Sequence, residues 1–84
     1  MLEVKYSNQA EDFLRKAEKV VVKRLMKKIE ELANNPFSQG IKSVEGYKER
    51  IFRIRVGDYR ILYEVDQNSN LLGIVKIDKR SRVY

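Results

Sequence analysis

Residues 51–65, IFRIRVGDYRILYEV, alternate apolar and polar side chains around a central Gly57-Asp58 pair. A period of two is typical of a strand with one buried face, and a Gly-Asp pair between two such runs predicts a two-residue hairpin turn. The hairpin predicts an antiparallel pair in which Val56 faces Tyr59 and Arg55 faces Arg60. Since a slip by one residue would bury arginines and expose apolar side chains, we expect this register to be strongly preferred.

The rest of the chain adds one strand before the hairpin, a helical region, and one strand after the hairpin. Residues 2–6 alternate as a short strand, and Asn8 with Glu11 resembles a capping box at a helix start. Apolar residues then recur at helical spacing until Pro36, and three consecutive valines predict two helices meeting near residues 18–20; the alternative is one bent helix. Residues 36–47 are expected to be a loop, and residues 71–77 a third strand of the sheet.

This order predicts one α+β domain over residues 1–84, with the element order β-α-α-β-β-β. Two N-terminal helices are expected to pack on one face of a small, mainly antiparallel sheet. The chain has no repeat, linker or long apolar run, so neither export nor a membrane span is predicted, and the cytoplasm is the expected compartment.

Composition excludes several kinds of chemistry. The 84 residues contain neither His nor Cys, which rules out disulfides, zinc sites with thiolate or imidazole ligands, and Ser-His-Asp or Cys-His nucleophiles. The 18 Lys and Arg residues outnumber the 12 Asp and Glu residues, for a net charge of +6, which favours a polyanionic or acidic partner. Any catalysis must therefore use Arg, Lys, Tyr, Asp or Glu.

The predicted register gathers cations on the sheet face that turns away from the helices. Arg53, Arg55 and Arg60 share this face, and if residues 66–70 form the next turn, Arg60 faces Lys76. Arg55 opposite Arg60 costs stability, because like charges across a ladder repel. A merely solvated face, with Glu64 and Asp78 neutralising part of the charge, is the alternative.

Functional use of this face is the interpretation we favour. Arginine is suited to phosphate, which its planar fork of donors can hold in two places at once. The chain ends with Arg80, Arg82, Val83 and Tyr84, and we expect this end to fold back beside the cationic face. Tyr84 then stacks on a base or takes part in proton transfer; the alternative is that it caps the core.

The residues resemble the RelE/ParE superfamily of toxins from toxin-antitoxin modules. The resemblance covers nearly the whole chain and is most specific in RIRVGDYRILYEV, followed by KR and VY near the end. Resemblance to the RelE branch implies a ribosome-dependent endoribonuclease, or mRNA interferase, that cuts mRNA in the ribosomal A site and inhibits translation under stress. It also implies neutralisation by a RelB-like antitoxin, in a heterodimer or heterotetramer, with no membrane partner.

Carried over by motif, the resemblance places catalytic residues at five positions. These are Arg53, Arg55, Arg60, Arg80 and Tyr84. The hairpin and the chain end had already indicated four of these five as a phosphate-binding surface. Basic residues near them are expected to bind RNA, although exposed loop lysines are often only solvated: Lys42, Lys48, Lys76, Lys79 and Arg82.

The implied chemistry uses no metal and no cofactor. Arg60 and Arg80 are expected on the scissile phosphate, Arg53 and Arg55 on phosphates and developing charge, and Tyr84 on the nucleophile or a base. Some relatives have lysine where Arg53 and Arg55 stand. Since arginine does not lose its proton, the general base stays open among Tyr84, Lys76 and Lys79; the alternative is that electrostatic stabilisation alone carries a slower reaction.

Two other functions remain as alternatives. One is a ParE-like toxin that inhibits DNA gyrase without cutting nucleic acid, because the superfamily shares a fold but not a single activity. The other is a basic module that binds RNA or the ribosome without catalysis.

Overall fold

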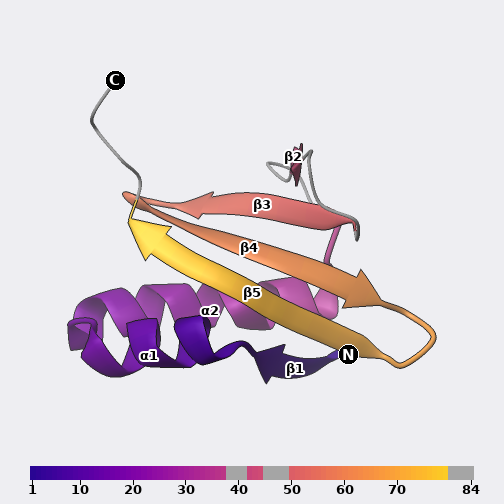
Figure 1. The fold of residues 1–84 in the computed structure, drawn as a ribbon, viewed down its shortest axis with the longest axis horizontal. Coiled ribbons are helices and arrows are strands. Elements are labelled where there is room, and N and C mark those ends of the chain that lie inside the picture. The colour runs from indigo at the N-terminus through magenta and orange to yellow at the C-terminus, as the bar shows by residue number, and fades with distance from the viewer. Residues whose placement is uncertain (38–41, 45–49, 80–84) are drawn as a thin grey trace.

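A five-stranded mixed sheet carries two helices on one of its faces (Figure 1). The structure, a computed structural model, describes residues 1–37, 42–44 and 50–79. The elements, in chain order, are β1 (Glu3–Tyr6), α1 (Asn8–Lys16), α2 (Lys19–Asn34), β2 (Lys42–Val44), β3 (Ile51–Val56), β4 (Tyr59–Asp66) and β5 (Leu71–Lys79). The predicted α+β class and order are confirmed, with β2 as an addition inside the segment that was expected to be a loop.

The strands lie in the order β1-β5-β4-β3-β2. The three neighbouring pairs from β2 to β5 are antiparallel, whereas β1 runs parallel to β5, with Val4 opposite Leu72. After β1 the two helices carry the chain across to β2 at the far edge of the sheet, and three antiparallel pairings then bring β5 back beside β1. The first strand of the chain therefore becomes one edge of the sheet, and β2 becomes the other.

The helical region is divided into two helices, as predicted. Ala17 and Glu18 both have extended backbone angles, with ψ of 156° and 149°, which separates the end of α1 from the start of α2. The N-cap of α1 is Ser7, whose side-chain oxygen accepts a hydrogen bond from the Ala10 amide at 3.1 Å. The prediction of Asn8 as the cap was therefore wrong by one residue.

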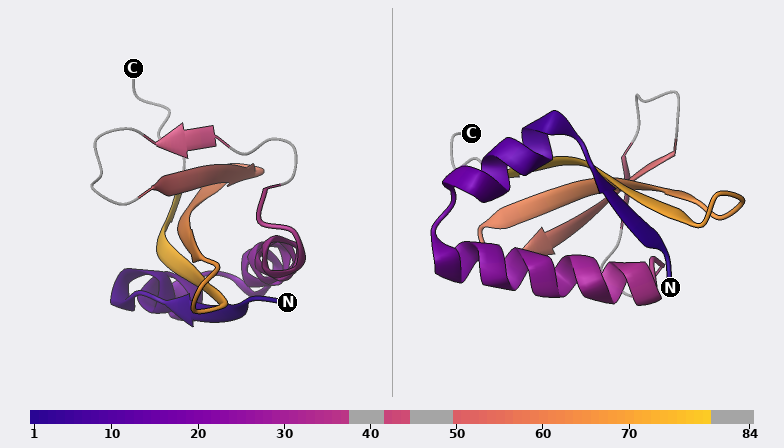
Figure 2. Two further views of the ribbon diagram at one scale, coloured as in Figure 1. Left: turned by 90° about the vertical axis from the view of Figure 1, so that its right-hand side faces the viewer. Right: turned by 90° about the horizontal axis from the view of Figure 1, so that it is seen from below.

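The core lies between the helices and the sheet, on the face predicted from the hairpin pattern. Tyr63, Ile61 and Ile54 of the sheet pack with Leu25 and Ile29 of α2. Figure 2 shows both helices on this side and no helix on the other. The sheet thus has a helix-covered face and an open face, and the two faces have different chemistry.

Within residues 1–37, 42–44 and 50–79, neither helix has the length and apolar character needed to cross a bilayer.

Tyr63 is completely buried in this core, and its hydroxyl donates a hydrogen bond to the carbonyl oxygen of Pro36 at 2.6 Å. This contact ties the segment after α2 to the centre of the sheet. Burial raises the pKa of the Tyr63 hydroxyl, because the charged phenolate is poorly solvated there. The folded protein therefore keeps the Tyr63 hydroxyl protonated.

Replacing Tyr63 with Phe should destabilise the protein by about 1 kcal/mol at pH 7, the usual net value of one hydrogen bond. Above pH 10 an unfolded tyrosine ionises while the buried one stays protonated, so wild-type stability should fall as pH rises. The Phe variant should lose part of this alkaline slope. Urea unfolding between pH 7 and pH 11 measures both effects, and identical slopes in the two proteins would contradict the assignment.

Candidate active site on the open face

The hairpin of β3 and β4 has the predicted register. Val56 pairs with Tyr59, Arg55 with Arg60, and Ile54 with Ile61. The turn begins at Gly57, which has a positive φ of 59°. A Cβ atom at this position would also lie 2.6 Å from a guanidinium nitrogen of Arg24 on α2. The backbone angle is what calls for glycine here, since the Arg24 guanidinium is the end of a flexible, exposed side chain that can move aside.

Four cations lie on the open face of β3, β4 and β5, and we call this group the arginine face: Arg53, Arg55, Arg60 and Lys76. Cross-strand pairing places them in two rows, Arg55-Arg60-Asp78 near the turn and Arg53-Leu62-Lys76 one step further on. Arg55 is exposed, and Arg53 and Arg60 are partly exposed. The prediction that these side chains share a face with Lys76 is confirmed.

Arg60 is held by Asp78 of β5. Its Nε lies 2.7 Å from one carboxylate oxygen of Asp78, and its Nη2 lies 3.2 Å from the other. A bidentate pair fixes the plane of the guanidinium group, and it uses two of the five N–H donors of arginine. Lys76 approaches the same carboxylate at 3.8 Å. Asp78 therefore orients Arg60 and also neutralises part of the face.

The predicted pairing of Arg60 with Lys76 was wrong by two residues. One comes from the turn, because Asp66, and not Val65, pairs with Leu71; the other comes from a β-bulge in β5. Leu62 pairs with Lys76 while the next residue, Tyr63, pairs with Ile74, so Val75 is the extra residue. The bulge moves Asp78 opposite Arg60. An isolated glycine in a strand is a signal for a bulge, and Gly73 lies two residues before Val75.

The start of α1 holds the bulged strand in place. The Ser7 hydroxyl donates a hydrogen bond to the Val75 carbonyl at 2.7 Å, in addition to capping α1. The side-chain amide of Gln9 donates to the Ile77 carbonyl at 2.7 Å and accepts from the Ile77 amide at 2.9 Å. The Gln9 side chain thus bonds the backbone of Ile77 as a neighbouring strand would. Lys76 and Asp78 are the residues directly before and after Ile77. These contacts fix the strand that orients Arg60.

Replacing Ser7 with Ala should cost about 1–2 kcal/mol in the free energy of unfolding, since it removes a helix cap and a hydrogen bond to the bulge. Ser7→Thr retains the hydroxyl and should cost less. Urea unfolding of the three proteins measures the difference. An alanine variant as stable as the wild type would show that the bulge does not depend on this contact.

Of the remaining predicted site residues, two lie in the described part of the chain, Lys42 and Lys79, and four lie outside it. Lys79 was predicted to bind RNA; it pairs with Tyr59 and so lies on the helix-covered side, away from the arginine face. The cause is again strand alternation, because Lys76 and Asp78 point to the open face and Lys79 to the other. The backbone of Lys42 pairs with Arg53 at the β2 edge. Outside the described residues lie Lys48, Arg80, Arg82 and Tyr84.

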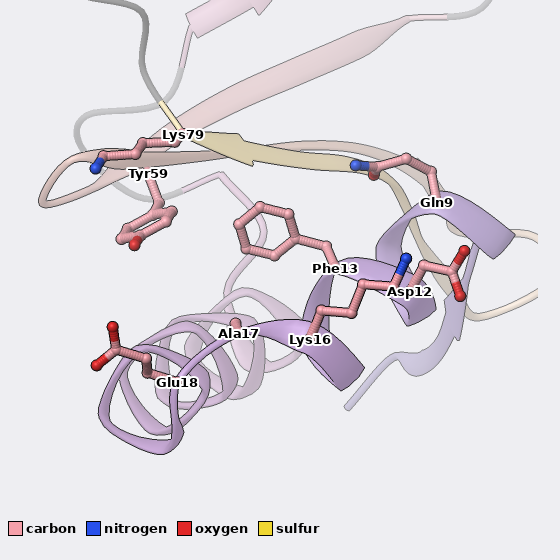
Figure 3. A pocket seen from close by; sticks show the side chains of 8 residues that line it. All are labelled: Gln9, Asp12, Phe13, Lys16, Ala17, Glu18, Tyr59 and Lys79. Atoms are coloured by element: carbon pink, nitrogen blue, oxygen red, sulfur yellow. The ribbon is translucent and has the colours of Figure 1, made fainter.

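Lys79 instead lines a pocket of about 520 Å³ between the end of β5 and the junction of α1 and α2 (Figure 3). Phe13 and Tyr59 form its inner wall, with ring centroids 5.8 Å apart and an edge-to-face arrangement. Asp12, Lys16 and Glu18 stand at its rim. The mixed charges of this rim make it a poor site for a polyanion.

The guanidinium groups of the arginine face can donate hydrogen bonds to an anion and so stabilise negative charge. The two tyrosines whose pKa is raised by burial, Tyr6 and Tyr63, belong to the helix-covered side. Neither is placed to act on a ligand of the arginine face. Among the described residues, no group of three His, Cys, Asp or Glu side chains lies close enough to hold a metal ion.

Comparison with known families gives one match over most of the chain. Residues 4–84 match the family described as ParE toxin of the type II toxin-antitoxin system, parDE. No curated protein sequence matches the chain.

Solved structures with the same fold include three RelE proteins. The archaeal RelE-RelB complex from Pyrococcus horikoshii OT3 is 26% identical, with a TM-score of 0.82 and 98% of each chain covered. The RelB-RelE complex from Methanococcus jannaschii is also 26% identical, with a TM-score of 0.66 and 88% of this chain and 87% of that chain covered. The isolated E. coli RelE toxin, at 21% identity, shares the fold, with a TM-score of 0.84 over 99% of this chain and 88% of that chain.

Proposed function

Given that the chain belongs to the RelE/ParE superfamily of toxins from type II toxin-antitoxin modules, we propose that it cleaves mRNA in the ribosomal A site. The observation that supports this most is the row Arg55-Arg60-Asp78 on the open face. It places two guanidinium groups side by side at a cost in stability, and it orients one of them through a bidentate ion pair. A face kept only for solubility has no need of that arrangement.

Cleavage of RNA by its own 2′-hydroxyl has three requirements. The hydroxyl must be deprotonated or polarised, the pentavalent phosphate must be stabilised, and the leaving 5′-oxygen must be protonated. The arginine face supplies the second requirement: Arg60 on the scissile phosphate, and Arg53 and Arg55 on neighbouring charge. We assign Arg80 to the same phosphate, and Tyr84 to the nucleophile or to a base.

The proton acceptor is assigned to a residue on the open face. Lys76 lies there with half of its side chain exposed, whereas Lys79 lies on the helix-covered side. Of these two lysines, Lys76 is therefore the better placed, and Tyr84 is the other candidate. A Lys76→Arg variant separates them, because arginine keeps the charge but does not accept a proton.

The partner that restrains this activity is proposed to be a RelB-like antitoxin. Two of the solved relatives at 26% identity are complexes of RelE with RelB. An acidic or amphipathic segment of the antitoxin would fit the arginine face by charge, and a heterodimer or heterotetramer would result. A complex that leaves the arginine face and the chain end exposed would contradict this mode of neutralisation.

The family description names ParE, so inhibition of DNA gyrase is the second candidate. The two functions separate in one experiment on cells expressing the toxin. We expect new 5′ ends in ribosome-bound mRNA and unchanged plasmid supercoiling. Intact mRNA together with blocked supercoiling would instead establish the gyrase function. Binding to ribosomes with neither effect would leave an RNA-binding module without catalysis.

A further inference from the structure

A second set of cations lies on α2, on the side of the helix that faces away from the sheet. Lys19, Lys23 and Lys27 are all exposed, and we call them the lysine stripe. Their spacing of four residues places them along one side of the helix over about 12 Å. Leu25 and Ile29, on the other side, are at most 1% exposed and pack in the core. Figure 2 shows α2 on the helix-covered side of the sheet. Since the stripe lies on the side of α2 away from the core, it and the arginine face lie on opposite sides of the two-layer fold.

The positions of these lysines do not favour the helix. Cations near a helix N-terminus oppose its dipole, and like charges four residues apart repel. Yet α2 begins with Lys19 and has no acidic residue in its first turn and no basic residue in its last. By contrast, α1 has Glu11 in its first turn and basic residues in its last, the favourable arrangement. Helix stability therefore does not explain the stripe.

The lysines of the stripe also make no ion pair or hydrogen bond with any side chain in the described part of the protein. Other surface cations do: Lys5 pairs with Glu3, Arg15 with Asp12, and Lys28 with Glu31. The difference is sharp within α2 itself, where Lys28 has an acidic partner and Lys27 has none. The stripe is thus open to an external anion.

The surroundings of the stripe indicate which kind of anion fits. A membrane surface would need a continuous apolar helix side to insert. The apolar side of α2 is buried in the core, and only Val20 and Met26, 62% and 40% exposed, remain as exposed large apolar side chains of this helix. A protein interface is usually depleted of lysine and anchored by aromatic residues or arginine, and the stripe has no such anchor. A row of flexible point charges is suited to a phosphate backbone, which presents regularly spaced charge without specific side-chain pockets. Because α2 contains no aromatic residue on which unpaired bases could stack, a base-paired segment fits it better than a single strand.

We propose that the lysine stripe binds the phosphate backbone of a base-paired RNA segment. The inference builds on the proposed function, in which the arginine face takes a single RNA strand. The protein would then lie between two RNA segments, with the cleaved strand on the open sheet face and a structured RNA against α2. Because the lysine stripe and the arginine face lie on opposite sides of the protein, they would bind two separate RNA segments and do not form one continuous groove.

The test compares two triple variants that remove the same charge. Lys19→Gln/Lys23→Gln/Lys27→Gln removes the stripe, and Lys5→Gln/Arg15→Gln/Lys28→Gln removes three cations that have acidic partners; each lowers the net charge from +6 to +3. The probe is an RNA duplex of about 20 base pairs, longer than the ~16 that a duplex-binding domain spans. Affinity is measured over a range of KCl concentrations, and thermal unfolding checks both folds.

We expect the stripe variant to bind the duplex about tenfold more weakly than the control at moderate salt. Its plot of log affinity against log salt should be shallower by about 2–3, near 0.9 for each lost phosphate contact. Equal affinities and slopes in the two variants would overturn the proposal. If the stripe variant bound polyglutamate more weakly but the duplex as well as the control does, the stripe would be a site for an acidic protein, and the proposal would also fail. Neither result depends on cleavage, so the absence of mRNA cleavage by the wild-type protein would refute the proposed function separately.

Discussion

Replacing Arg60 with Ala should lower the rate of mRNA cleavage on ribosomes by about 10²–10³-fold, the usual loss when one donor to a developing anion is removed. Arg60 stands in the middle of the arginine face, opposite Arg55 and held by Asp78. Arg60→Lys keeps the charge but loses the planar fork, so it should recover only part of the rate. Growth inhibition by the expressed toxin should follow the same order.

Arg15→Ala is the matched control for this experiment. Arg15 also forms an ion pair with an aspartate, at 3.0 Å, but it lies on α1 and away from the arginine face. Its replacement should leave the rate within about twofold of wild type. The Arg60 variant should remain folded, because a partly exposed ion pair contributes about 1 kcal/mol or less. Full cleavage by a folded Arg60→Ala protein would remove this residue from the site.

Replacing Asp78 with Asn should change catalysis and RNA binding in opposite directions. The variant loses the carboxylate that orients Arg60, so we expect kcat to fall about 30-fold. It also adds one net positive charge to the arginine face, so RNA should bind a few-fold more tightly, with a lower KM. This pattern identifies a residue that positions a catalytic group and does not itself bind substrate.

The control for Asp78 is Asp12→Asn, which makes the same change of charge on α1, where Asp12 pairs with Arg15. It should alter kcat little. The kinetic constants come from initial rates over a range of mRNA concentrations on programmed ribosomes. A fall in kcat accompanied by weaker RNA binding would indicate that the whole face is disturbed and would contradict the positioning role.

The hairpin could be predicted from sequence because two independent features agree there. Side-chain alternation fixes which residues face the helices, and the Gly57-Asp58 turn fixes which residues lie opposite each other. Together they place Arg55 opposite Arg60 without any knowledge of the rest of the fold. The break between the helices was predictable for a similar reason, since the apolar stripe changes phase at the valines.

The pairing of β5 could not be obtained in this way. The turn before it is one residue shorter than predicted, because Asp66 belongs to β4 and only residues 67–70 connect the strands. The bulge at Val75 is stabilised by Ser7, which lies far away in sequence. Local patterns do not contain such a contact. The same reasoning explains the short β2, whose three residues gain their strand form by pairing with β3. That Asp78 neutralises part of the face was considered from the sequence, but its bidentate pairing with Arg60 follows from the tertiary structure.

The most direct test of the account uses purified toxin, ribosomes and two messages that differ in one atom. One message has ribose at the A-site codon, and the other has a 2′-deoxy sugar at the position of the cut. We expect the first message to be cleaved only when it is bound to ribosomes, and the second to stay intact because the 2′-hydroxyl is the nucleophile. Equal cleavage of both messages, or cleavage of neither by folded toxin, would contradict it.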